Sequence, residues 1–287
     1  MDYETEQIIH AIQSLKQDSN FLKDYLFPIL SAFFASILGA AAAYFSLKYH
    51  QYVETEKEKL NITNKWLLLA EEARSNLIAI KQNYHGTLNH HPIQRMLAIP
   101  TILFISVPIA EDYSRLSFLI PKAPSNTGPK WSQISRIRAM IHNYNYLLKL
   151  WRKRNEIEQS IKIAILDQFP AVTYDALDPN QVMGYADKSS LLLLIDLTEH
   201  VIRLTDDLLF EFNDFLSNFP DYAKTLINLK QLEQYGSVLS YSHNGNKKLI
   251  AIHEKSPEAD YQPVTELFGM TLEQLKQRHT TGYENKG

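Results

Sequence analysis

Residues 31–43 read SAFFASILGAAAA and lie in the middle of the longest uncharged segment of the chain. This segment runs from Tyr25 to Leu47 and contains 23 residues. An α-helix of that length, rising ~1.5 Å per residue, is about 35 Å long, whereas the hydrocarbon layer of a bilayer is about 30 Å thick. The sequence therefore predicts a transmembrane helix over residues 25–47, with the lipid bilayer around it.

Two other structures remain open for this segment. A cleaved signal peptide has a basic start and an apolar core of about 7–15 residues, whereas residues 1–24 are acidic and the apolar segment is longer. A buried helix of a soluble core would have a similar composition. Tyr25 and Tyr44, near the two ends, resemble the aromatic belts of membrane helices and favour the transmembrane interpretation.

Small residues recur at every fourth position of the segment. Between helices in lipid, burial of a large apolar side chain gains little, whereas small side chains let two backbones approach closely. We therefore predict that one face of the helix packs against the same face of a second copy. A simpler interpretation is that Ala and Gly are common in membrane helices. The predicted packing residues are Ser31, Ala35, Gly39 and Ala43.

Lysines near the predicted span indicate its orientation. Positively charged residues favour the cytoplasmic side of a membrane, and more of them follow the span than precede it. We therefore expect a bacterial inner-membrane protein whose C-terminal body lies in the cytoplasm. Residues 1–24 are expected to form a short amphipathic tail. The lysines before the span are Lys16 and Lys23, and those after it are Lys48, Lys57, Lys59 and Lys65.

Residues 48–236 carry the apolar periodicity of long α-helices. Glycine and proline are sparse in the chain, with 9 and 12 residues, which suits long helices. The expected helices cover residues 48–85, 131–166, 187–217, and a shorter stretch from Pro220 to before Gly236.

The core-facing side of each helix is predicted from apolar residues at steps of three and four. In the first helix they are Trp66, Ala70, Ala73, Leu77, Ile80 and Tyr84. In the second they are Ile134, Ile137, Ile141, Tyr144, Leu148 and Trp151, followed by Ile157, Ile161 and Ile165. In the third they are Leu191, Leu194, Val201, Leu204, Leu208, Phe212 and Phe215.

A second apolar stretch covers residues 96–110. It is too short to span a bilayer, and Pro100 and Pro108 interrupt it. We expect buried, partly irregular chain here, leading into a short helix at 108–119 with Ser106 as its N-cap. A half-inserted membrane segment stays an alternative.

The C-terminal part changes character at residue 237. Asn244-Gly245, between two β-prone runs, is the preferred turn of a β-hairpin, so a two-stranded hairpin is predicted over residues 237–252. Thr271, with Gln274 at the capping-box position, predicts a final short helix. The expected fold is mainly α: a transmembrane helix, a bundle of long helices, and a hairpin-and-helix appendage. The predicted divisions are 1–24, 25–47, 48–236 and 237–287.

The sequence predicts no catalytic, cofactor or metal site. The chain has no cysteine, which excludes thiolate chemistry, and the net charge of −3 gives no reason to expect a nucleic-acid partner. Phosphate-binding and nucleophile-elbow motifs do not occur. Three sets of polar residues are expected to be solvated: His85, His90 and His91; Glu199 and His200 with Asp206 and Asp207; and Arg152, Lys153 and Arg154.

Two helical segments carry a resemblance to a class of proteins. An N-terminal span followed by KWLLLAEEARSNLIAIK (65–81) and SQISRIRAMIHNYNYLLKLWRKRNEIEQ (132–159) resembles bacterial single-pass membrane proteins grouped with abortive infection and phage defence. The resemblance lies in helical texture over about residues 45–165, without an invariant motif, and 237–252 departs from it. The resemblance implies a role in phage defence, as a sensor or effector. From the predicted span and its small residues we expect a protein that oligomerises and acts by contact with another protein or with the membrane. A membrane-tethered enzyme, with an active site assembled from separate helices, stays the alternative.

Overall fold

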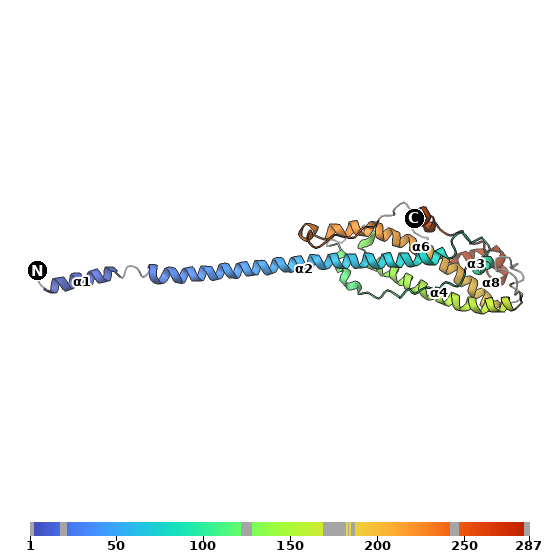
Figure 1. The fold of residues 1–287 in the computed structure, drawn as a ribbon, viewed down its shortest axis with the longest axis horizontal. Coiled ribbons are helices and arrows are strands. Elements are labelled where there is room, and N and C mark those ends of the chain that lie inside the picture. Colours follow the sequence, from blue (N-terminus) through green and yellow to red (C-terminus); the bar gives the residue numbers. More distant parts are fainter. Residues whose placement is uncertain are drawn as a thin grey trace. The chain divides into compact units, whose positions relative to one another are not determined.

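The fold is described from a computed structural model that covers residues 3–17, 22–121, 128–168, 182, 184, 187–241 and 247–283. The chain divides into two compact units, Met1–Glu58 and Lys59–Gly287. Within the described ranges the protein is mainly helical and has no β-strand (Figure 1).

The first unit contains α1 (Tyr3–Gln17), a π-helical turn η2 (Leu22–Leu26), and the beginning of α2 (Phe27–Gln82). Among the described helices, α2 with the turn before it is the one long and apolar enough to cross a membrane. The predicted transmembrane segment is thus helical throughout. Length and composition alone make it a candidate span, because a signal sequence or a buried helix could share them.

The second unit contains the rest of α2 and the remaining helices. The α-helices are α3 (Pro92–Ala98), α4 (Ile134–Gln168), α6 (Lys188–Leu226), α7 (Lys247–His253), α8 (Thr265–Phe268) and α9 (Leu272–Arg278). The short 3₁₀-helices are η3 (Tyr113–Leu119), η4 (Lys130–Ser132), η6 (Leu229–Leu232) and η7 (Gln262–Val264).

The predicted core faces are nearly all buried. Every member of the α2 set, from Trp66 to Tyr84, and every member of the α6 set is buried. In α4 the set is also buried, except that Ile134 and Ile157 are half-buried. The periodicity therefore located the core correctly, because the residues that recur every three or four positions share one side of a helix.

Aromatic side chains join the three long helices. Tyr84, just after α2, stacks on Trp151 of α4 with ring centroids 5.8 Å apart. Tyr144 of α4 meets Phe212 of α6 edge-on at 5.8 Å. Such pairs add about 0.5–1.5 kcal/mol each to the gain from burial. The long helices are thus held as one body by large side chains.

A separate apolar cluster closes one end of this body. It gathers residues from α3, the end of α4, the start of α6 and the C-terminal helices. Thr271 caps α9 and shares a capping box with Gln274, as predicted. The buried members of the cluster include Ile93, Met96, Leu97, Ile161, Ile165, Leu191, Leu194, Ile195, Tyr261, Val264 and Leu275.

The predicted β-hairpin is not supported. Residues 247–253 form the helix α7, and residues 237–241 have no regular structure. The Asn244-Gly245 turn lies outside the described residues. Ile252 is buried, and Asn213 of α6 lies 2.8 Å from the His253 ring. Docking against α6 therefore overrides the local β-propensity, which depends strongly on context.

Pro220 does not divide the third helix as predicted. Helix α6 continues through it to Leu226, so one helix replaces the two expected. A proline removes one backbone donor from a helix, at a cost of about 3 kcal/mol. Phe219, Pro220 and Ala223 are all buried, and this packing offsets the lost hydrogen bond.

The apolar stretch 96–110 is only half buried. Met96, Leu97, Ile99 and Ile102 are buried, as expected, but the chain turns outward from Leu103. The helix expected at 108–119 is the shorter 3₁₀-helix η3, and its N-cap is Asp112, not Ser106. The Asp112 carboxylate accepts the Ser114 N–H at 2.9 Å, which satisfies a free donor at the helix start. Residues 92–98 form the short helix α3, which leads into this stretch.

Candidate functional site

The predicted packing face lies on α2 and is exposed. Ser31, Ala35, Gly39 and Ala43 all have exposed side-chain positions. A Cβ atom built on Gly39 meets no other atom within 4 Å. A larger side chain at Gly39 therefore fits the helix itself, so any effect of such a change would come from another molecule.

Large apolar side chains flank this face. Phe34 and Leu38 are 59% and 69% exposed, and every residue from Lys23 to Ala40 is exposed. Each step of four residues turns about 40° around the helix axis, so the small residues form a slowly winding stripe. The structure places these residues on one stripe, while their pairing with a second copy stays a prediction.

The second unit has buried charged side chains, and one of them is Glu199, which was expected on a solvated face. Arg95 of α3 and Glu199 of α6 form an ion pair of 2.7 Å, with side chains 2% and 0% exposed. The Arg95 guanidinium also donates to the carbonyl oxygens of Asn89 at 3.0 Å and Pro257 at 2.6 Å. Tyr261 donates to the other Glu199 oxygen at 3.4 Å. Both charges are therefore satisfied inside the protein.

Lys81 and Asp206 form a second buried ion pair, 2.6 Å long. The Lys81 ammonium also donates to the carbonyl of Glu254 at 2.5 Å, and Asp206 accepts the Ser256 N–H at 2.7 Å. Residues 254–260, here called the strap, are thus fastened at Glu254, Ser256 and Pro257. His90 adds two contacts of 2.7 Å each. Its ring nitrogen Nδ1 contacts the Glu258 carbonyl oxygen, and its own carbonyl oxygen accepts the Asp260 N–H.

A small polar cavity of about 90 Å³ lies under the strap. Its volume suits several water molecules. Arg95 and Asp206 reach it, and their charges are already paired. The lining residues are Arg95, Ile202, Arg203, Asp206, Asp207, Lys255, Ser256, Pro257, Glu258 and Ala259.

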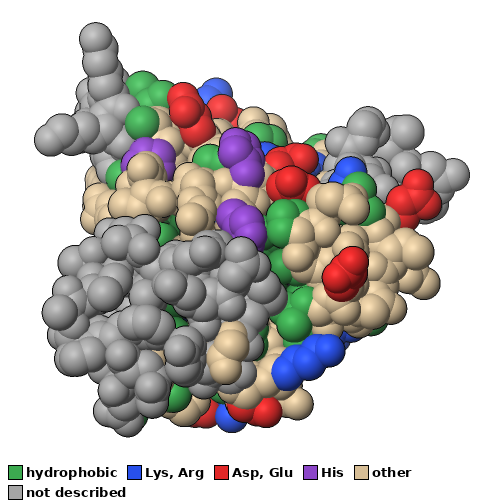
Figure 2. All heavy atoms as spheres, turned by 90° about the vertical axis from the view of Figure 1, so that its right-hand side faces the viewer, with side chains coloured by type: hydrophobic (Ala, Val, Ile, Leu, Met, Phe, Trp, Pro, Cys, Tyr) green, Lys and Arg blue, Asp and Glu red, His purple; other side chains and the backbone are tan. Residues whose placement is uncertain are grey.

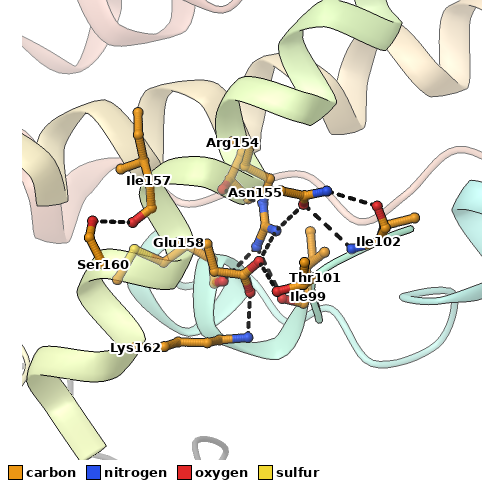
Figure 3. Close-up of polar contacts among 11 residues, drawn as sticks. Ile99, Thr101, Ile102, Arg154, Asn155, Ile157, Glu158, Ser160 and Lys162 are labelled. Atoms are coloured by element: carbon orange, nitrogen blue, oxygen red, sulfur yellow. Dashed lines mark hydrogen bonds and ion pairs between the residues drawn. The ribbon is translucent and has the colours of Figure 1, made fainter. Parts of the chain in front are cut away.

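Arg154 belongs to the third of these buried ion pairs (Figure 3). It pairs with Glu158 at 2.9 Å and donates to the carbonyls of Met96 at 2.9 Å and Ile99 at 3.0 Å. Burial lowers the pKa of the Arg154 guanidinium, and the nearby Glu158 carboxylate opposes this effect. Lys162 also contacts Glu158. The contacts fasten the chain after α3 onto α4. Arg154 is therefore buried, contrary to the expected solvated triplet, whereas Arg152 and Lys153 are exposed as expected.

Asp196 joins the C-terminal helix to α6. Burial alone would raise the pKa of its carboxyl group, but hydrogen bonds from His279 and Arg278 outweigh burial and hold the pKa well below its usual range. Arg278 Nε lies 2.7 Å from the carboxylate, and His279 stacks on Tyr261 with centroids 4.9 Å apart. This arrangement docks α9 beside the strap.

Histidine side chains reach the surface at the end of the molecule seen in Figure 2. His85 and His90 are exposed, while the His91 ring accepts the Ile93 N–H at 3.3 Å and caps α3. Across the described ranges, no group of three His, Asp or Glu side chains is placed to hold a metal ion. Of these residues, His91 caps α3 and His90 contacts the strap. His200 lies against the Tyr146 ring.

Three carboxylates that were expected on a solvated face have different surroundings in the structure. They are Glu199, Asp206 and Asp207. All three are buried, not on a solvated face. Asp207 accepts the Thr281 hydroxyl at 2.5 Å. One signal was present in the sequence: Arg154 follows Trp151 at core spacing, so a charge occupies a core position of the repeat. The partners were not predictable, because Arg95 and Glu199 are 104 residues apart in the chain.

Comparison of the chain with protein-family models, with curated proteins and with solved structures finds no match. The functional argument therefore rests on the sequence and the geometry described above.

Proposed function

We propose that this chain is a single-pass protein of the bacterial inner membrane, with a helical body in the cytoplasm. The observation that supports this most directly is the uncovered apolar helix formed by η2 and the start of α2, where all residues from Lys23 to Ala40 are exposed. Exposed apolar surface of this extent is unfavourable in water. A helix, with its backbone groups bonded internally, is suited to the hydrocarbon layer.

The proposal includes self-association through Ser31, Ala35, Gly39 and Ala43. Small residues at this spacing allow close helix approach, and the bulky side chains on the neighbouring surface face lipid. The uncovered stripe supports this, because an added Cβ at Gly39 has open space around it.

The body acts through contacts with protein or membrane rather than by catalysis. Its buried charges fasten α3, the 96–102 segment and the strap, and they lie in paired, hydrogen-bonded surroundings. A body whose segments are fastened in this way can present a rigid surface for contact with a protein or a membrane. The resemblance to abortive-infection membrane proteins suggests the role, a sensor or effector in phage defence.

Two measurements test this proposal. Membranes from expressing bacteria are extracted with alkaline carbonate, and we expect the protein to stay in the membrane fraction. Phage plating is then compared between cells with the wild-type chain, the Gly39→Ile variant and the Leu38→Ile control. We expect fewer plaques with the wild-type and Leu38→Ile chains only. Release by carbonate would refute the anchor, and unchanged plating for every phage tested would refute the defence role.

A further inference from the structure

The outer face of α4 is positively charged although the whole chain is not. Residues 133–155 contain six basic residues and no acidic residue, whereas the chain has a net charge of −3. Two of the six, Arg136 and Arg154, pair with buried carboxylates. The other four side chains are exposed and are here called the basic stripe. They are Arg138, Lys149, Arg152 and Lys153.

The basic stripe lies on one side of the helix. With 3.6 residues per turn, its four members fall within about 100° of one another around the helix axis. Two exposed rings, His142 and Tyr146, lie beside the stripe and between Arg138 and Lys149 along the helix. Arg138 and Lys153 are ~22 Å apart along the axis. The outer face of α4 therefore presents cations and rings in one row.

The protein itself neutralises little of this charge. Within the described ranges, no carboxylate forms an ion pair with Arg138 or Lys149. Lys153 pairs with Glu156 at 3.0 Å, but both side chains are exposed and water screens the pair. Arg152 donates to the Ser106 carbonyl at 3.0 Å, which holds the guanidinium and leaves its charge in place. The stripe can therefore attract an anionic partner.

A hollow of about 300 Å³ opens beside the C-terminal end of the basic stripe. The Arg152 guanidinium lies over the Phe104 ring, 5.4 Å from its centroid, and both side chains line the hollow. Aromatic rings and guanidinium planes are the groups on which proteins stack unpaired bases. Glu156 and Gln159 also line the hollow and are exposed, so they can hydrogen-bond the edge of a base.

We propose that the outer face of α4 binds single-stranded nucleic acid. The phosphates lie along the basic stripe, and one base enters the hollow and stacks on Phe104 and Arg152. Proteins that bind single strands combine a positively charged surface for the backbone with rings on which bases stack. This proposal depends neither on the membrane anchor nor on the role in phage defence.

The hollow favours a nucleic acid over other anionic partners. An acidic peptide or an anionic lipid headgroup would be attracted by the basic stripe, but neither supplies a planar base for the hollow. A nucleotide carries a phosphate and a base together. A duplex keeps its bases paired and stacked, so it would leave the hollow empty. The position of the hollow beside the stripe therefore points to a single strand.

Binding can be measured with the full chain in a neutral detergent and a fluorescein-labelled single strand of about 15 nucleotides. We expect fluorescence anisotropy to rise with protein concentration. The Kd should increase steeply with salt, because each phosphate contact releases counterions from the strand. No binding at about 50 mM salt would overturn the proposal.

Two double variants with the same loss of charge test the basic stripe. Arg138→Gln with Lys149→Gln should raise the Kd at least tenfold and reduce the slope of log Kd against log salt by about 1–2. Lys188→Gln with Lys276→Gln removes exposed charges outside α4 and should keep the Kd within threefold. Equal weakening by the two would overturn the stripe, because net charge alone would then decide binding.

Variants of Phe104 test the hollow. Phe104→Ala removes the ring and should raise the Kd fivefold or more, whereas Phe104→Tyr keeps a ring and should stay within twofold. Unchanged tryptophan fluorescence would show that each variant is folded. An unchanged Kd for a folded Phe104→Ala variant would overturn the stacking of a base.

Competitors distinguish the partners on the wild-type chain, so this measurement needs no variant. Unlabelled single strand should displace the labelled strand at least tenfold better than poly-glutamate, duplex DNA or phosphatidylglycerol vesicles at the same concentration of charge. Equal displacement by poly-glutamate would overturn the proposal in favour of an acidic protein, and equal displacement by vesicles in favour of a membrane surface. Equal displacement by duplex would show phosphate contacts alone and overturn the single-strand site.

Discussion

At the residue scale, the buried ion pairs make the body intolerant of single charge removal. Arg95→Ala leaves the Glu199 carboxylate buried without its partner, so we expect the free energy of unfolding to fall by about 3–5 kcal/mol. Urea unfolding in detergent can be followed by tryptophan fluorescence, because Trp66, Trp131 and Trp151 are all buried in the second unit.

An exposed ion pair supplies the matched control. Lys153 and Glu156 lie 3.0 Å apart with side chains 58% and 64% exposed. Lys153→Ala should change the free energy of unfolding by less than about 1 kcal/mol, because water screens such pairs. Similar losses for Arg95→Ala and Lys153→Ala would contradict the structural role of the buried pair.

Asp196 makes the free energy of unfolding of the body depend on pH. Its folded-state pKa is depressed, so the stability it contributes is present above about pH 4 and is lost as the pH falls toward the folded-state value. Its carboxylate is partly exposed, so we expect Asp196→Asn to cost about 1 kcal/mol at pH 7. The variant should also show a shallower loss of stability between pH 4 and pH 2 in urea titrations. Parallel pH profiles for both proteins would contradict this.

At the element scale, helix periodicity predicted more than local propensity did. The core faces of α2, α4 and α6 were found because burial repeats with the helical turn. Periodicity did not predict that α6 continues through Pro220 or that α7 is helical, because both depend on packing against distant residues. The outward turn at Leu103 was missed for a similar reason, since an apolar run carries no mark of which residues find partners.

The stripe on α2 provides the prediction for an element. Gly39→Ile places a branched side chain where two helices are proposed to approach, so we expect self-association in bilayers to weaken at least tenfold. Leu38→Ile, on the neighbouring surface, should leave it within twofold. Energy transfer between labelled chains in vesicles measures both. Equal association of the two variants would contradict the stripe, because Gly39→Ile meets no steric obstacle within its own helix.

At the scale of the whole molecule, the sequence predicted the mainly helical fold and the candidate span, while the buried charges of the body stayed hidden. A long uncharged segment is recognisable from composition alone. In contrast, the sequence does not distinguish the buried charged residues from exposed ones, because they come together only when α2, α3, α6 and the strap pack. They include Lys81, Arg95 and Asp206. A site assembled from separate elements leaves only an indirect trace in the sequence, a charge at a core position.

The orientation of the chain in the membrane is a prediction about the whole molecule. Lysines after the span should keep the body in the cytoplasm and send the acidic tail across the membrane. In intact bacterial spheroplasts, a membrane-impermeant maleimide should label Glu4→Cys at once, and Lys230→Cys only after lysis. Both positions lie outside the candidate span, and the absence of native cysteine removes background labelling. The reverse pattern would place the body outside the cytoplasm, and the proposed intracellular role would fail with it.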